Sequence, residues 1–183
     1  MIINEDTPGV KKQLYRYVYE GNLTGSSLVF KISIHVIGNI FCDGDITSNG
    51  YLSCDKNISC GGDISCNTDI SCGGNISCQK NITSNTYIHC EGDISCKGNL
   101  ICKDGMTCKG NVTSYRYIYC GEDLFCDGNL SCGGDISCRG GISCGQSIFC
   151  GRNLSSGGTI ISKAGNIACK AILTSTSCKA ILT

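Results

Sequence analysis

Residues 56–78 read KNISCGGDISCNTDISCGGNISC, in which the tripeptide ISC returns every six residues. The spacing extends far beyond this stretch, because an aliphatic residue or methionine occupies every sixth position from Ile40 to Ile160, giving 21 hexads without a slip. Two places after each of these residues stands cysteine in 16 hexads and serine in the other five. Side chains alternate along a strand, so the two positions share one face. Short strands of this kind, separated by glycine-containing corners, predict a β-solenoid.

The residue before each aliphatic position indicates how many hexads make one turn. At a spacing of 18 residues these positions form a nearly uniform column: Asn39, Asn57, Asn75, Asp93, Asn111, Asn129 and Ser147. At a spacing of 12 the column mixes asparagine with tyrosine and aspartate. We therefore predict an all-β, triangular β-solenoid (β-helix) with three hexapeptides, or 18 residues, per turn and about seven turns. An asparagine ladder, in which each amide bonds to the amides above and below it, is expected to stabilise the stack.

The segment before the hexads, residues 1–37, predicts an N-terminal β-hairpin. Two apolar stretches with strand alternation, 12–19 and 28–37, flank the turn-rich link EGNLTGSS. The hairpin is expected either to cap the open end of the solenoid or to act as a docking surface.

The hexads themselves span residues 38–163, and residues 164–183 break their register. The last segment contains two related sequences, ACKAILT (168–174) and SCKAILT (177–183). We expect it to form an irregular turn whose open strand edges promote assembly.

The chain has 18 cysteines, and stacking by 18 residues predicts one unbroken column of six: Cys54, Cys72, Cys90, Cys108, Cys126 and Cys144. Parallel strands hold neighbouring Cβ atoms about 4.8 Å apart with parallel directions, which suits a disulfide poorly. We therefore interpret the column as reduced thiols that fill a thin core as small apolar groups. Two alternatives remain open, namely disulfides within a layer or between chains, and a metal-binding or electron-carrying thiol ladder. Cys169 and Cys178, outside the regular repeat, are the candidates for cross-linking.

No catalytic, cofactor or metal site is expected from the sequence. The histidines are His35 and His89, and His89 occupies an outward position where spacing fixes no acid or nucleophile beside it. Acyltransferases with a left-handed β-helix also have a hexapeptide repeat, but their small residue stands two places before the aliphatic one and long loops interrupt the repeat. In this chain the small core residue stands two places after the aliphatic one and no loop interrupts the hexads, which argues against that class of enzyme. Aromatic residues near the middle of the repeat predict an interaction patch at Tyr115, Tyr117, Tyr119 and Phe125.

The phrases GGDISC, EGDISCKGNLIC and GGDISCRGGISC resemble the G-[DN]-[IV]-x-[small]-x repeats of bactofilins and related polymer-forming short-repeat proteins. The resemblance covers residues 38–163. It implies a right-handed triangular β-helix that polymerises end to end without nucleotide. Members of that family usually carry small or aliphatic residues where this chain has cysteine.

Composition restricts the class of function. Lysine plus arginine equals aspartate plus glutamate at 15 each, which argues against nucleic acid as a partner. The sequence shows neither a signal-peptide pattern nor an apolar run long enough for a membrane span, so a cytoplasmic location is expected. Assembly into a spore coat, an extracellular fibre or a virus particle is an alternative that the sequence leaves open.

We predict a non-enzymatic structural protein that self-assembles through its ends or edges into a filament, fibre or shell. Its expected partners are copies of itself and other structural proteins. The alternative is a binding module that presents a flat face to ice, a glycan or a partner protein.

Overall fold

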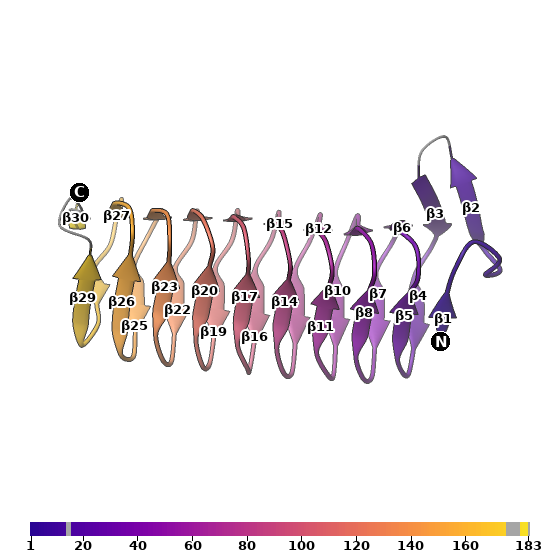
Figure 1. Cartoon of the computed structure of the whole chain (residues 1–183), viewed down its shortest axis with the longest axis horizontal. Helices are drawn as coiled ribbons and strands as arrows, with labels where there is room; N and C mark the ends of the chain where they lie inside the picture. Colours follow the sequence, from indigo (N-terminus) through magenta and orange to yellow (C-terminus); the bar gives the residue numbers. More distant parts are fainter. Residues whose placement is uncertain (14–15, 175–179, 183) are drawn as a thin grey trace.

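The structure is a computed structural model and describes residues 1–13, 16–174 and 180–182. There the chain forms a rod of stacked coils, each made of three short strands joined by corners (Figure 1). Strand partners lie 18 residues apart through the regular part, as in the pair Ile58 and Ile76. The predicted all-β solenoid and its 18-residue turn are therefore confirmed. The described residues form no helix that could cross a membrane.

Three sheets run along the rod, and each takes one strand from every regular coil. Sheet 1 contains, in spatial order, β1 (Ile2–Ile3), β5 (Leu28–Phe30), β8 (Ile46–Ser48), β11 (Ile64–Cys66), β14 (Ile82–Ser84), β17 (Leu100–Cys102), β20 (Ile118–Cys120), β23 (Ile136–Cys138), β26 (Asn153–Ser156) and β29 (Ala171–Thr174). Sheet 2 contains β2 (Val10–Gln13), β3 (Arg16–Glu20), β6 (Ile34–Ile37), β9 (Leu52–Cys54), β12 (Ile70–Cys72), β15 (Ile88–Cys90), β18 (Met106–Cys108), β21 (Leu124–Cys126), β24 (Ile142–Cys144), β27 (Ile160–Ser162) and β30 (Ala180–Leu182). Sheet 3 contains β4 (Leu23–Gly25), β7 (Ile40–Cys42), β10 (Ile58–Cys60), β13 (Ile76–Cys78), β16 (Ile94–Cys96), β19 (Val112–Ser114), β22 (Leu130–Cys132), β25 (Ile148–Cys150) and β28 (Ile167–Ala168).

The solenoid has about nine turns rather than the predicted seven. Leu28 and Ile34 keep the six-residue spacing before Ile40, but Phe30 and Val36 follow them where the repeat has cysteine or serine. Strands β5 and β6 nevertheless pair in parallel with β8 and β9 of the next coil. The inward aliphatic residue, rather than the small residue after it, therefore defines a coil.

The N-terminal hairpin is present, but its two strands are not the ones predicted. Strand β2 pairs antiparallel with β3, so that Val10 lies opposite Tyr19. The stretch 28–37 instead joins the solenoid, and β3 lies parallel to β6. The physical reason is burial, because Leu28 and Ile34 are covered only when their strands close a coil.

The core is a thin column of side chains enclosed by the three sheets. The aliphatic residues from Ile40 to Ile160 are at most 1 % exposed, and the cysteines or serines two places later face the same interior. Burying one isoleucine side chain stabilises a fold by about 1.5–3 kcal/mol. Repetition of this small unit along the rod, rather than one central cluster, therefore stabilises the fold.

The asparagine column works mainly through the backbone. The side-chain oxygen Oδ1 of Asn57 accepts the backbone N–H of Asn75 at 2.8 Å, and that of Asn75 accepts the N–H of Asp93 at 2.8 Å. A direct amide-to-amide bond also occurs, from Nδ2 of Asn57 to Oδ1 of Asn39 at 3.1 Å. Aspartate carries the same acceptor oxygen, which explains why Asp93 interrupts the asparagines without interrupting the ladder.

The corners need glycine where successive coils approach closely. A Cβ atom at Gly61 would collide with the carbonyl oxygen of Asp43 on the preceding coil. The same corner is held by the bond from the Gly61 N–H to the Cys42 carbonyl, at 2.9 Å. The glycine of the repeat therefore permits the close stacking that the backbone bonds between coils require.

Candidate functional site: thiol columns, outer faces and coil ends

The six cysteines predicted to stack lie on consecutive strands of sheet 2. Their Cα atoms are register partners from coil to coil, and each side chain is at most 3 % exposed. The partners are Cys54, Cys72, Cys90, Cys108, Cys126 and Cys144. Val36 precedes the column and Ser162 follows it. The column is therefore closed by side chains at both ends.

Most of these thiols are hydrogen-bond donors as well as core filler. The Sγ atom of Cys72 donates to the carbonyl of Lys56, at 2.8 Å, and to that of Asn75, at 3.3 Å. Ser84 makes the equivalent bonds in sheet 1, with Oγ 2.7 Å from the Thr68 carbonyl and 3.1 Å from the Tyr87 carbonyl. Each such residue thus bridges a corner of its own coil and a corner of the preceding one.

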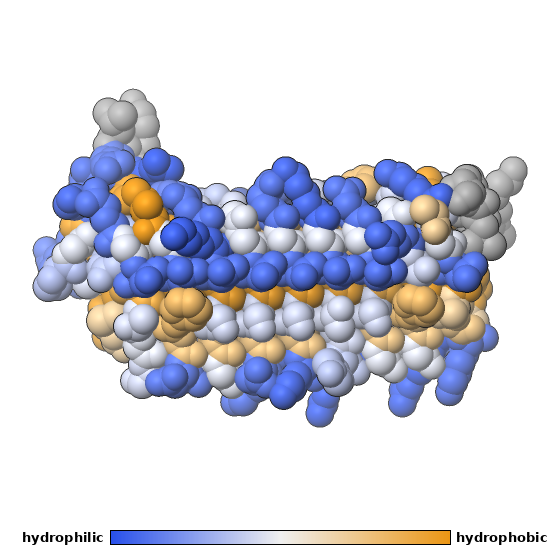
Figure 2. Space-filling model, turned by 180° about the vertical axis from the view of Figure 1, so that it is seen from behind, coloured by the Kyte–Doolittle hydropathy of each residue, from blue (hydrophilic) through white to orange (hydrophobic). Residues whose placement is uncertain are grey.

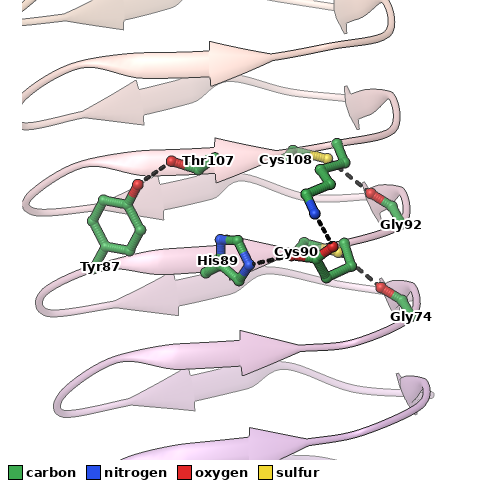
Figure 3. A network of polar contacts seen from close by, with 9 residues as sticks. Gly74, Tyr87, His89, Cys90, Gly92, Thr107 and Cys108 are labelled. Atoms are coloured by element: carbon green, nitrogen blue, oxygen red, sulfur yellow. Dashed lines mark hydrogen bonds and ion pairs between the residues drawn. The ribbon is translucent and has the colours of Figure 1, made fainter.

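This finding adds a hydrogen-bonding role to the interpretation of the cysteines as small core filler. The sequence carried a signal for it, since all five replacements are serine and none is alanine or valine. Serine and cysteine share size and a donor hydrogen, although the thiol is the weaker donor. Figure 3 shows the pattern on two coils, with Cys90 and Cys108 bonded to the carbonyls of Gly74 and Gly92.

Burial keeps most thiols protonated. It raises the pKa of Cys132 to about 11, and a hydrogen bond with the Cys108 thiol, with burial, raises the pKa of Cys90 to about 12. All cysteines of the described residues are free thiols. Within those residues no three metal-ligating side chains converge.

The two cysteines outside the repeat have different outcomes. Cys169 is a half-buried free thiol that packs against the end of the core, beside Cys150. Its partial exposure leaves cross-linking through this residue as a prediction. Cys178 lies outside the described residues.

The structure does not bring the four predicted patch residues together. Tyr115 and Tyr117 lie in the corner between β19 and β20, where they line a groove of about 440 Å³ with Arg116 and Arg152. Tyr119 projects from sheet 1, whereas Phe125 projects from sheet 2. The tyrosines therefore belong to one edge of the rod, and Phe125 is an isolated apolar group on another face.

One outer face is flat and rich in hydroxyl groups. On sheet 3 a row of small side chains projects outward between two exposed phenylalanines: Phe41, Ser59, Ser77, Ser95, Thr113, Ser131 and Phe149. Figure 2 shows the side of the rod opposite to Figure 1, with a hydrophilic band along its length and apolar groups near both ends of the adjoining face.

Sheet 2 carries both histidines on its outer face, and each has an acidic partner. His89 Nε2 lies 2.7 Å from Glu91 Oε1, and Glu91 also pairs with Lys109 (Figure 3). His35 has two partners, with Nδ1 2.9 Å from Ser53 Oγ and Nε2 3.0 Å from Asp55 Oδ1. Sequence reasoning missed this serine–histidine–aspartate group. The 18-residue period could have found it, since it stacks residue 35 on residue 53.

No family model, curated protein or solved structure matches this sequence. The fold, a β-solenoid of stacked parallel coils, follows from the register of the strands alone. The likeness to bactofilins is therefore a likeness of the repeat.

Proposed function

We propose that the chain is a structural rod that self-assembles end to end through its terminal coils. One observation carries this proposal. Ile172 on β29 continues the core column above Leu154, yet it is 43 % exposed while Leu154 is fully buried. A core residue is thus open to solvent at the end of sheet 1 in the part of the chain that the structure describes, and a stacked strand of a second copy would cover it.

The strand edges favour two of the three sheets for this contact. Sheet 1 ends at β1 and β29, and sheet 3 ends at β4 and β28. These strands pair in parallel with their neighbours, so a second rod with the same polarity would continue both sheets. Unpaired edges of this kind template strand addition.

The N-terminal edge of sheet 2 differs from the edges of the other sheets, because the hairpin places an antiparallel strand there. The outermost strand β2 runs antiparallel and carries the exposed residues Lys11 and Lys12. Lysines on an edge strand oppose pairing with another chain. We therefore propose that the hairpin limits the end-to-end contact between copies and sets its orientation. The polymerisation implied by the resemblance to bactofilins agrees with this proposal.

The test compares two lysine substitutions at apolar residues of similar exposure. Ile172→Lys places a charge at the proposed contact, whereas Phe125→Lys places it on the side of the rod. Sedimentation velocity is expected to show multiples of the 19.3 kDa chain for the wild type and Phe125→Lys, and single chains for Ile172→Lys. Single chains in all three samples, or equal loss in both variants, would contradict the proposal.

A binding module is the second candidate, and the hydroxyl row on sheet 3 favours it. Small side chains in register between Phe41 and Phe149 form a flat surface that a glycan or a partner protein could contact. Ice binding would need a regular threonine array, which this row lacks. Wild-type rods that stay single at every protein concentration would make this candidate the better one.

A further inference from the structure

Asp55 decides which nitrogen of His35 carries the proton. A carboxylate only accepts hydrogen bonds, so Nε2, 3.0 Å from Asp55 Oδ1, must be the protonated nitrogen that donates to it. The lone pair of Nδ1 then faces Ser53 Oγ at 2.9 Å, and the serine hydroxyl must donate. A hydroxyl bonded to a base that a third group orients is the arrangement that activates a nucleophile.

We propose that Ser53 is an activated nucleophile that accepts an acyl or phosphonyl group from small activated esters and fluorides. Ser53 Oγ attacks the carbonyl carbon, and its proton moves to Nδ1 of His35. The bond to the leaving oxygen breaks, and His35 passes the proton to that oxygen. Asp55 stabilises the imidazolium while the proton is held. With a phosphonyl fluoride the phosphorus–fluorine bond breaks instead, and fluoride and the proton leave together.

The surroundings cover most of both the base and the nucleophile. Val18 of the hairpin is the register partner of His35 on its other side and is fully buried. The His35 side chain is 14 % exposed. Ser53, at the outward position of β9, is 8 % exposed and is followed on the next coil by Ser71, whose side chain is small. Partial exclusion of water strengthens the bonds of the group, while a small substrate can approach over Ser71.

The main chain limits what happens after the first step. Strand β9 lies between β6 and β12, so its N–H groups are used in the sheet and form no oxyanion hole. Attack on activated donors therefore leads to a covalent adduct that accumulates, because hydrolysis of an unactivated ester-like bond lacks this stabilisation. The site is a modification site for reactive acyl and phosphonyl groups rather than a rapid hydrolase.

The next coil supplies a matched control. Ser71 is the register partner of His89, just as Ser53 is of His35. His89 turns Nε2 toward Glu91, and among the described residues no hydrogen bond joins it to Ser71. Ser71 thus has the same strand position and a neighbouring histidine, but no base.

The experiment treats the full chain with a fluorophosphonate probe and locates the adduct by peptide mass spectrometry. Ser53 is expected to be labelled at least about tenfold faster than Ser71. Asp55→Asn should lower the rate at Ser53 by at least about tenfold, because the asparagine amide donates to Nε2 and places the proton on Nδ1. His35→Gln, which removes the base, should do the same, and Ser71→Ala should change nothing.

Two results would overturn the proposal. One is labelling of Ser53 and Ser71 at the same rate in the wild type. The other is an unchanged rate at Ser53 in Asp55→Asn, a half-exposed residue whose replacement leaves the core intact. Circular dichroism on each variant shows that the solenoid is folded, so a loss of labelling reports the chemistry.

Discussion

The middle coils and the terminal coils are built from the same repeat but differ in what covers them. In the middle, Ile88 is stacked between Ile70 and Met106 and is fully buried. At the C-terminal end of sheet 1, Ile172 has a partner on one side and is nearly half exposed. The comparison shows that each strand of a solenoid is paired and covered by neighbouring coils on both sides, except at the two ends of the stack. Burial therefore stabilises the middle of the rod, and we propose that the ends make the contact with other copies.

The largest expected effect separates these two isoleucines. Ile88→Ala should lower the free energy of unfolding by about 2–5 kcal/mol, because it leaves a cavity in a closed core. Ile172→Ala should cost less than about 1 kcal/mol, because part of the side chain is already in water. Denaturant unfolding at equal protein concentration measures both. Equal losses would show that the end is as covered as the middle.

The second effect concerns the thiols of the middle coils as donors. Cys90→Ala removes the bonds from Sγ to the Gly74 and Asp93 carbonyls and should cost about 1 kcal/mol. Cys90→Ser keeps a donor at the same place and should cost clearly less. Chemical denaturation of the two variants gives the comparison. If serine were no better than alanine, the thiol would be a space filler and its hydrogen bonds would be irrelevant to stability.

The third expected effect is a loss of stability in alkali, which is absent near neutral pH. The pKa of Cys132 rises from 9.0 to about 11 because the thiol is buried. The unfolded chain therefore loses protons that the folded chain keeps, so stability is constant below about pH 9 and falls as the pH rises toward 11. Denaturation midpoints at about pH 8 and about pH 10.5 measure the drop.

Cys132→Ser serves as the control for the alkaline effect, since it removes one shifted thiol without removing a donor. The fall in the midpoint should be smaller in this variant than in the wild type. A midpoint that does not change with pH in the wild type would mean that the buried thiols titrate as they do in the unfolded chain.

The regular part of the fold could be predicted from the sequence because the same hexad pattern recurs many times. The period of Asn39, Asn57 and Asn75 gave the 18-residue turn, and the structure has the same register. The first coil was not predicted because Phe30 and Val36 stand where the repeat has cysteine or serine. The alternation of residues 28–37 was therefore interpreted as a hairpin strand. The position of a coil depends on its inward aliphatic residue, and that signal is weak where only two hexads carry it.

The candidate sites could be predicted only in part, because they depend on contacts between coils. Stacking by 18 residues could place His35 over Ser53, but the approach of Asp55 from the following corner depends on the path of the backbone there. The predicted patch grouped Phe125 with Tyr119, yet the six residues from one to the other lead to the next sheet. The carbonyl bonds of the thiols likewise require the geometry of two successive corners.

Negative-stain electron microscopy of the purified chain, with and without reductant, tests the central claim most directly. The account predicts rods that join end to end into filaments in both conditions, because strand edges make the contact and the thiols of the described residues are free. Single short rods at all concentrations would contradict it. Filaments that disperse on reduction would contradict it too, since disulfides rather than strand edges would then hold the copies together.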